Sequence, residues 1–162
     1  KNMLELKTPE KVAKFELING AKVKSSGGVK YIIGLRTGLT ESAFKSAYTS
    51  SENVTIKVTK ASTGRYLGTG SKVVVTSTID GSTIGEYVIL IYGDLNGDGN
   101  VNLNDSTYLS RALKNKVTLT PAQRLAANLN GDRAVNLIDG TLLLSVVRNK
   151  GTINQSTGKV VR

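Results

Sequence analysis

The sequence predicts an α+β protein: a β-rich, sandwich-like N-terminal part with one short helix, followed by a small all-α C-terminal part. Two observations predict this division. Residues 1–92 contain runs of β-branched and aromatic residues, separated by glycine, serine and asparagine. From Gly93 on, loops of Asp, Asn and Gly are each followed by a stretch rich in leucine and alanine. We therefore expect three parts, a β-rich domain at 1–92, a helical domain at 93–151 and a tail at 152–162, with the two domains packed together because no flexible linker separates them.

Four segments of the N-terminal part have the composition of strands, and we expect antiparallel pairing next to a loosely held N-terminal segment. The glycines at positions 64, 68 and 70 indicate a hairpin, because the lysine and the helix of a phosphate-binding loop are missing. Thr40–Tyr48 is predicted to be a helix capped by Thr40. The expected strands are Val29–Leu35, Val54–Thr59, Lys72–Thr78 and Glu86–Tyr92.

The composition excludes several kinds of chemistry. The chain contains no cysteine and no histidine, which excludes disulfides, thiolate zinc sites and histidine-based triads.

The net charge of +10 is spread over the whole chain, with 13 Lys and Arg against 7 Asp and Glu in residues 1–92 and 9 against 5 in residues 93–162. We expect a solvated basic surface, no nucleic-acid partner and no membrane insertion. The start does not resemble a signal peptide, so any export signal is expected outside this sequence.

The C-terminal part contains an internal repeat with the spacing of a twelve-residue calcium loop. Asp94–Lys116 and Asn128–Lys150 share 12 of 23 aligned positions. Oxygen-bearing side chains occupy positions 1, 3, 5, 9 and 12, while position 7 offers its backbone carbonyl. All five acidic residues of 93–162 belong to this set. The predicted calcium ligands are Asp94, Asn96, Asp98, Asn100, Asn102 and Asp105 in the first loop, and Asn128, Asn130, Asp132, Ala134, Asn136 and Asp139 in the second.

The second loop departs from the calcium pattern at two positions. Asn128 replaces the aspartate of position 1, which leaves two carboxylates where the first loop has three. Arg133 replaces Gly99 at position 6, where a left-handed backbone is expected, at a cost of about 1 kcal/mol. We therefore expect two calcium sites, with weaker binding at the second loop.

The loops GDLNGDGNVNLND (93–105) and ANLNGDRAVNLID (127–139), each opening a helix, resemble the dockerin module. Dockerins are small calcium-dependent modules that attach secreted proteins to cohesin modules of cellulosome-like complexes for polysaccharide degradation. The preceding part, with GTGSKVVV at 68–75 and YVILIYGDLNGDG at 87–99, resembles the X modules found upstream of some dockerins. The loops differ from EF-hand sensors, because position 12 is Asp and no helix precedes the first loop.

The resemblance also implies a docking face, formed by one helix face and by loop positions 10 and 11. Dockerins that bind in two orientations keep nearly identical residues in both repeats, whereas here Ser110-Arg111 corresponds to Leu144-Ser145. Single or dual binding therefore stays open, as does the cohesin type. The implied partner-contacting residues are Leu103, Asn104, Thr107, Ser110, Arg111, Leu137, Ile138, Thr141, Leu142, Ser145 and Arg148.

The segment Leu142–Val147 is hydrophobic around nearly its whole circumference, which predicts burial on more than one side. We expect Leu143 and Val147 in the core of the helical part. The remaining apolar side chains either contact a partner or pack on the β-rich part, and both alternatives are open. Residues 120–127 are predicted to be a short connecting helix. The polar tail is expected to be mobile unless Val160-Val161 pairs with a strand.

Together these features favour a non-catalytic, calcium-dependent docking module, secreted and monomeric or in a 1:1 complex with a cohesin. Its basic charge leads us to expect an acidic cohesin surface and association rates that fall with salt. The alternative is a calcium-stabilised surface adhesion or glycan-binding module, which the few aromatic residues make difficult. An enzyme is not expected, because the acids of the second half are committed to calcium and those of the first half are isolated.

Overall fold

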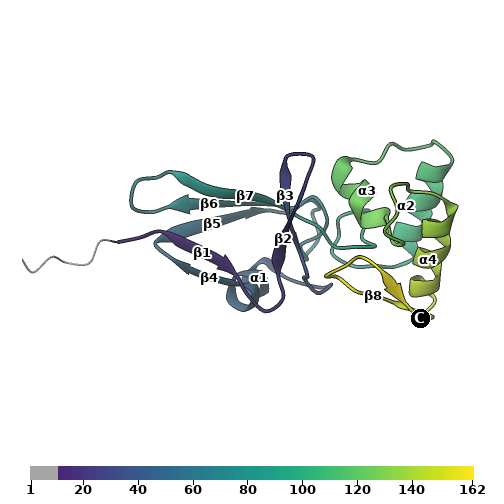
Figure 1. The fold of residues 1–162 in the computed structure, drawn as a ribbon, viewed down its shortest axis with the longest axis horizontal. Helices are drawn as coiled ribbons and strands as arrows, with labels where there is room; N and C mark the ends of the chain where they lie inside the picture. Colours follow the sequence, from purple (N-terminus) through teal and green to yellow (C-terminus); the bar gives the residue numbers. More distant parts are fainter. Residues whose placement is uncertain (1–10) are drawn as a thin grey trace, which may run out of the picture.

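The structure, a computed structural model, describes residues 11–162. It is α+β, with a β-rich N-terminal region and four helices within these residues. Figure 1 shows β1–β7 and α1 towards one end of the molecule and α2, α3 and α4 at the other. The elements follow in the order β1 (Lys14–Leu17), β2 (Lys22–Ser26), β3 (Val29–Ile33), α1 (Glu41–Tyr48), β4 (Thr49–Glu52), β5 (Val54–Thr59), β6 (Lys72–Ser77), β7 (Thr83–Ile89), α2 (Leu103–Leu113), α3 (Pro121–Ala127), α4 (Leu137–Val147), β8 (Thr152–Ile153) and β9 (Val160–Val161).

The β-rich region is built around a five-stranded sheet of order β2-β3-β7-β6-β5. Neighbouring strands are antiparallel except β3 and β7, whose parallel pairing joins Tyr31 to Val88 and Ile32 to Ile89. The expected antiparallel pairing is therefore wrong at this one place. β7 begins at Thr83 and ends at Ile89, so the strand lies upstream of the expected Glu86–Tyr92.

One face of this sheet packs against α1 and the two-stranded β1–β4 sheet. Thr40 caps α1 as predicted, since its Oγ1 accepts a hydrogen bond from Ala43 N at 3.1 Å. Phe44 is fully buried in the core between them. The strands β1, β2 and β4 were not among the four expected strands, and each is only four or five residues long. The loosely held N-terminal segment falls mainly on residues 1–10, outside the described residues, and β1 is paired with β4.

A second core joins the β-rich region to the helices, as expected from the missing linker. Tyr31 and Leu90 from the β-rich region are buried with Leu109 of α2 and Leu143 of α4. The two regions thus share apolar side chains, so the helices are not an independent layer.

The last residues form the short antiparallel pair β8–β9, so Val160-Val161 does pair with a strand. Between β8 and β9, the Gln155 side chain accepts from Tyr92 N at 2.8 Å and donates to Tyr92 O at 2.9 Å. The Gln155 carbonyl also accepts from Gly34 N at 3.0 Å. This hairpin therefore contacts the chain where the β-rich region meets the helices, as Figure 1 shows for β8.

Candidate metal centre

Three carboxylates of the first predicted calcium loop lie together. One oxygen from each of Asp94, Asp98 and Asp105 falls within a group spanning at most 4.8 Å. Asp94 and Asp105 are fully buried. Among residues 11–162 the one ion pair joins Lys45 to Glu41, so no described cationic side chain pairs with these three acids.

Backbone amides orient the buried Asp105. Its Oδ1 accepts from Leu95 N at 2.8 Å and from Asn96 N at 3.2 Å. Its Oδ2 accepts from Asn102 N at 2.9 Å, which closes a capping box at the start of α2. The same carboxylate therefore ends the loop and starts the helix.

Asp94 is held in a comparable way at the start of the loop. Its Oδ1 accepts from Gly97 N, and its Oδ2 accepts from Gly99 N and Thr69 N, each at 3.0 Å. Burial raises the pKa of Asp94 to about 7, against the lowering effect of the Thr69 and Gly99 amides, and the negative charge of Asp105 adds to the rise. Burial also raises the pKa of Asp105. Buried, mutually repelling carboxylates of this kind suit a hard divalent cation.

The Asn and Asp side chains of the first loop shape its turn. Asn96 Oδ1 accepts from Asp98 N at 3.2 Å, and Asp98 Oδ1 accepts from Asn100 N at 2.9 Å. Asn102 caps α2 by accepting from Asn104 N at 3.0 Å. The side chains expected at positions 3, 5 and 9 are thus ordered by local hydrogen bonds.

The second loop repeats part of this arrangement. Asp139 is fully buried, and its two oxygens accept from Leu129 N at 2.8 Å and Asn136 N at 3.0 Å, as those of Asp105 do in the first loop. Asn130 Oδ1 accepts from Asp132 N at 3.2 Å, and Asp132 Oδ1 accepts from Ala134 N at 3.0 Å. The 34-residue repeat therefore extends to hydrogen-bond geometry from position 2 to position 12 of the loop.

Position 1 is where the second loop differs. The Asn128 amide group donates to the Asp132 carbonyl, and its buried Oδ1 has no partner among the described residues. Arg133 is not among the residues with a positive φ, whereas Gly99 has a φ of 84°. The expected left-handed strain at Arg133 is therefore wrong, because this loop takes a different backbone conformation at position 6. This unpartnered oxygen of Asn128 is suited to coordinate a cation.

Basic side chains also lie near the second loop. A Cβ added at Gly131 would come within 3.1 Å of Lys159 Cε, so the Lys159 side chain lies against the loop. Arg133 belongs to the loop itself. The second loop thus has two carboxylates where the first has three, with the Lys159 side chain beside it.

The predicted docking residues lie mainly on the exposed surface of α2 and α4. Leu103, Leu137 and Ile138 expose 61%, 75% and 57% of their surface. Leu142 instead packs against the second core, and Ser145 is half-buried with its hydroxyl donating to the Leu142 carbonyl at 2.6 Å. The other proposed contacts are exposed: Asn104, Thr107, Ser110, Arg111, Thr141 and Arg148. As expected, Leu143 is buried and Val147 packs beside it.

Two residues beside the first loop were missed by sequence reasoning. Gly68 and Thr69 come from the long connection between β5 and β6, and both touch Asp94 or its loop. Their cluster of glycines was visible in the sequence, but it indicated a turn and gave no sign of the loop it approaches.

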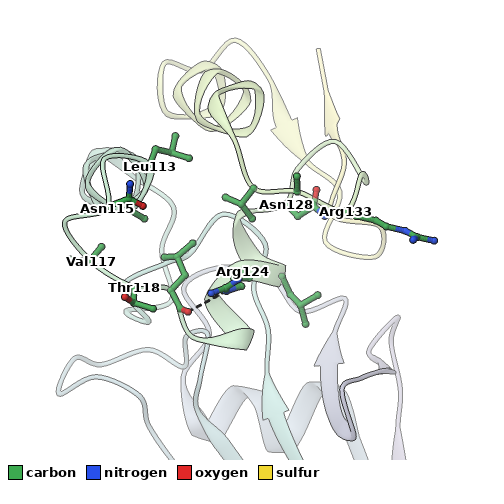
Figure 2. Close-up of a pocket in the computed structure, with 12 residues that line it drawn as sticks. Leu113, Asn115, Val117, Thr118, Arg124, Asn128 and Arg133 are labelled. Carbon is green, nitrogen blue, oxygen red and sulfur yellow. Dashed lines mark hydrogen bonds between the residues drawn. The ribbon is translucent and has the colours of Figure 1, made fainter.

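A cleft of about 560 Å³ lies between the end of α2, α3 and the second loop. Figure 2 shows Asn128 on one side, Asn115 and Val117 across from it, and Arg133 pointing away. Arg124 Nε donates to the Leu119 carbonyl at 3.4 Å beside this cleft. Its lining residues include no carboxylate, although Asn128 and Ala134 of the second loop are among them.

None of the helices within residues 11–162 combines the length and apolar character of a membrane-spanning segment.

Comparison with known proteins gave a match to the segment that contains the two loops. Residues 92–146 match the family model of the Dockerin type I domain, which is less than half of the chain. No curated protein and no solved structure matched. Dockerin domains bind Ca²⁺ and cohesin partners. The match supports a dockerin module in the region that carries both acidic loops and helices α2, α3 and α4.

Proposed function

We propose that residues 93–151 form a calcium-dependent docking module that binds a cohesin and anchors its parent protein in a cellulosome-like extracellular complex. The observation that carries this proposal is the group of Asp94, Asp98 and Asp105 inside the segment that matches the dockerin family. The buried carboxylates have no described cationic partner, and a bound Ca²⁺ would supply the missing positive charge.

Two ions are proposed, one in each loop, with tighter binding in the first. The ligands are those assigned from the sequence, beginning at Asp94 and Asn128. The unpartnered Asn128 oxygen supports a second ion. The missing carboxylate at position 1 and the nearby Lys159 support its weaker binding.

The ion would act on docking through the helices. Asp105 and Asp139 cap α2 and α4 from inside the two loops. Fixing these carboxylates therefore fixes the first turns of both helices, where Leu103, Leu137 and Ile138 are exposed. We propose that these apolar side chains form the centre of the cohesin contact, with the polar residues of the same faces around them.

We further propose that this chain is non-catalytic and that residues 1–92 are an accessory X-module-like domain. In the β-rich region, Glu41 pairs with Lys45 at 3.0 Å, and Asp80 accepts from the Ser82 hydroxyl at 2.7 Å. These acids are engaged in local surface contacts, which supports a structural role.

Pull-down with a panel of cohesins tests the proposal. Wild-type protein should capture a cohesin in calcium and lose it in excess chelator. Asp98→Ala should weaken capture at limiting calcium, whereas Asp80→Ala, which removes an exposed acid far from the loops in sequence, should behave as wild type. Complex formation that is unaffected by chelator would refute calcium-dependent docking.

A further inference from the structure

We infer that Gly68 and Thr69 of the β5–β6 connection are positioning residues for the first metal loop, so that its calcium affinity depends on the β-rich region. The inference rests on the proposed function in one respect, namely that this loop binds calcium. It assigns to two residues outside the loop a role in holding Asp94.

Thr69 is fixed on two sides. Its backbone N–H donates to Asp94 Oδ2 at 3.0 Å in a buried hydrogen bond. Its hydroxyl donates to the Ile91 carbonyl at 3.0 Å and accepts from the Ile91 amide at 3.1 Å. Because Ile91 lies three residues before Asp94, the hydroxyl sets the donor at a defined place relative to the carboxylate.

Position 68 requires glycine because there is no room for a side chain, and not because the backbone has a positive φ. It is absent from the glycines with positive φ. A Cβ at this position would lie 2.1 Å from the Gly97 carbonyl oxygen and 2.5 Å from Asp94 Oδ2. An alanine side chain would therefore push on the backbone of the metal loop and on a proposed ligand at once.

Two further contacts fix the same part of the loop. Gly38 N donates to the Gly99 carbonyl at 2.9 Å. A Cβ at Gly99 would come within 2.6 Å of the Leu67 carbonyl oxygen. The β-rich region thus contacts loop positions 1, 4 and 6, so these atoms are placed before an ion arrives. Groups that orient metal ligands in this way typically change metal affinity by about 10- to 100-fold when they are altered.

The second loop provides an internal comparison. Asn128 occupies the position of Asp94, and its Oδ1 has no described partner. Gly131, the counterpart of Gly97, approaches the Lys159 side chain, and among residues 11–162 a Cβ built there meets no other atom within 4 Å outside the adjacent residues. A change at Gly68 should therefore affect the first loop and leave the second largely unchanged.

Calorimetric calcium titration of the full chain tests the inference with Gly68→Ala. We expect about tenfold or weaker binding at the tight site, with the weak site unchanged. Gly64→Ala is the matched control, since among the described residues its Cβ would meet only Ser62 Oγ, at 3.2 Å, and both sites should stay as in wild type. The Gly68→Ala and Gly64→Ala titrations are then repeated in an Asp132→Ala background. This change weakens the second loop, so that calcium binding at the first loop is measured separately. Unchanged tight-site affinity in Gly68→Ala would overturn the inference.

Amide hydrogen exchange in the wild-type chain gives a second test that needs no variant. Saturating calcium should slow exchange at Thr69 N–H by about tenfold or more, because binding and opening of this contact are linked. Gly64 N–H, which donates to Ser62 Oγ at 3.1 Å in the same connection, should not change. Equal exchange at Thr69 with and without calcium would contradict the inference. If wild type binds no calcium at all, the proposed function fails as well.

Discussion

Asp94 combines burial with negative charge, and this conflict determines how the loop responds to pH. Burial raises its pKa to about 7. The folded metal-free chain therefore retains a proton between pH 3.8 and about 7 that the unfolded chain has released. The free energy of unfolding of the metal-free protein should accordingly fall as pH rises through this window. Calcium requires the ionised form, so protons and calcium compete for the same carboxylate.

The first prediction follows from this competition. Calcium affinity at the first loop should increase with pH up to about 7 and then level off. Calorimetric titration in buffers with different ionisation enthalpies would also show proton release on binding below that pH. Affinity that is constant between about pH 5 and pH 8 would contradict the prediction.

A second prediction concerns Asn128. Asn128→Asp gives the second loop its third carboxylate and an acceptor for nearby amides, so calcium should bind there about tenfold more tightly, ~1.4 kcal/mol. The measurement is a calcium titration that resolves the two sites. Ser50→Asp, which adds the same charge at an exposed residue of β4, is the control and should leave the second site nearly unchanged.

At the scale of elements, metal loops and helix caps share the same carboxylates. Asn102 and Asn136 are the N-caps of α2 and α4, and Asp105 and Asp139 complete their capping boxes. Either aspartate can therefore be tested for a structural role that persists without calcium.

Asp139→Ala tests that role in the second loop. It removes hydrogen bonds to Leu129 and Asn136 amides and should lower the free energy of unfolding by about 1–3 kcal/mol even in chelator. Asp132 is exposed, so Asp132→Ala should weaken calcium binding with little effect on the chelated protein. Chemical denaturation of both variants in chelator checks the difference. Equal destabilisation by the two changes would contradict it.

The fourth prediction concerns the proposed docking face. Leu137→Asp places a charge on the most exposed of the apolar helix residues and should weaken cohesin binding more than tenfold. Calcium affinity and unfolding should stay as in wild type. Surface binding kinetics against one cohesin would measure the loss of affinity. Val12→Asp, at an exposed residue of the β-rich region, is the control. Equal losses from both variants would argue against this face.

At the scale of the whole molecule, the second core makes the two regions one packing unit. Tyr31 and Leu90 are buried together with Leu109 and Leu143. The Gln155 side chain closes the same junction through its two hydrogen bonds to Tyr92. A substitution that loosens packing in the β-rich region should therefore also lower the stability of the helices.

Tyr31→Ala tests this coupling. Tyr31 exposes only 3% of its surface, and its truncation should cost about 3–5 kcal/mol. Thermal unfolding followed by a helix signal and by a β-sheet signal should shift to lower temperature together. A lowered sheet transition with an unchanged helix transition would show that the regions are independent. Tyr66→Ala, at a half-buried residue of the β5–β6 connection, is a milder comparison.

Much of the local structure could be predicted because it depends on neighbouring residues. The alternation of Val54, Ile56 and Val58 predicted β5, and Thr40 and Pro121 marked the starts of α1 and α3. The strands β1, β2 and β4 were missed because segments of four or five residues give only a weak pattern, and long-range pairing such as that of Lys14 with Glu52 defines them. The same holds for the parallel β3–β7 pair, which no local pattern signals.

The amino-acid sequence alone is enough to predict the spacing of the two loops, the charge of each and the start of the helix that follows. These features are local, since a repeated Asp/Asn pattern sets both turn geometry and capping within a dozen residues. The packing of the folded chain brings Thr69 to Asp94, Gly68 to the first loop and Lys159 to the second loop. Those contacts join residues far apart in the chain. Their existence depends on how the sheet, the helices and the final hairpin pack together, and no single segment carries that information.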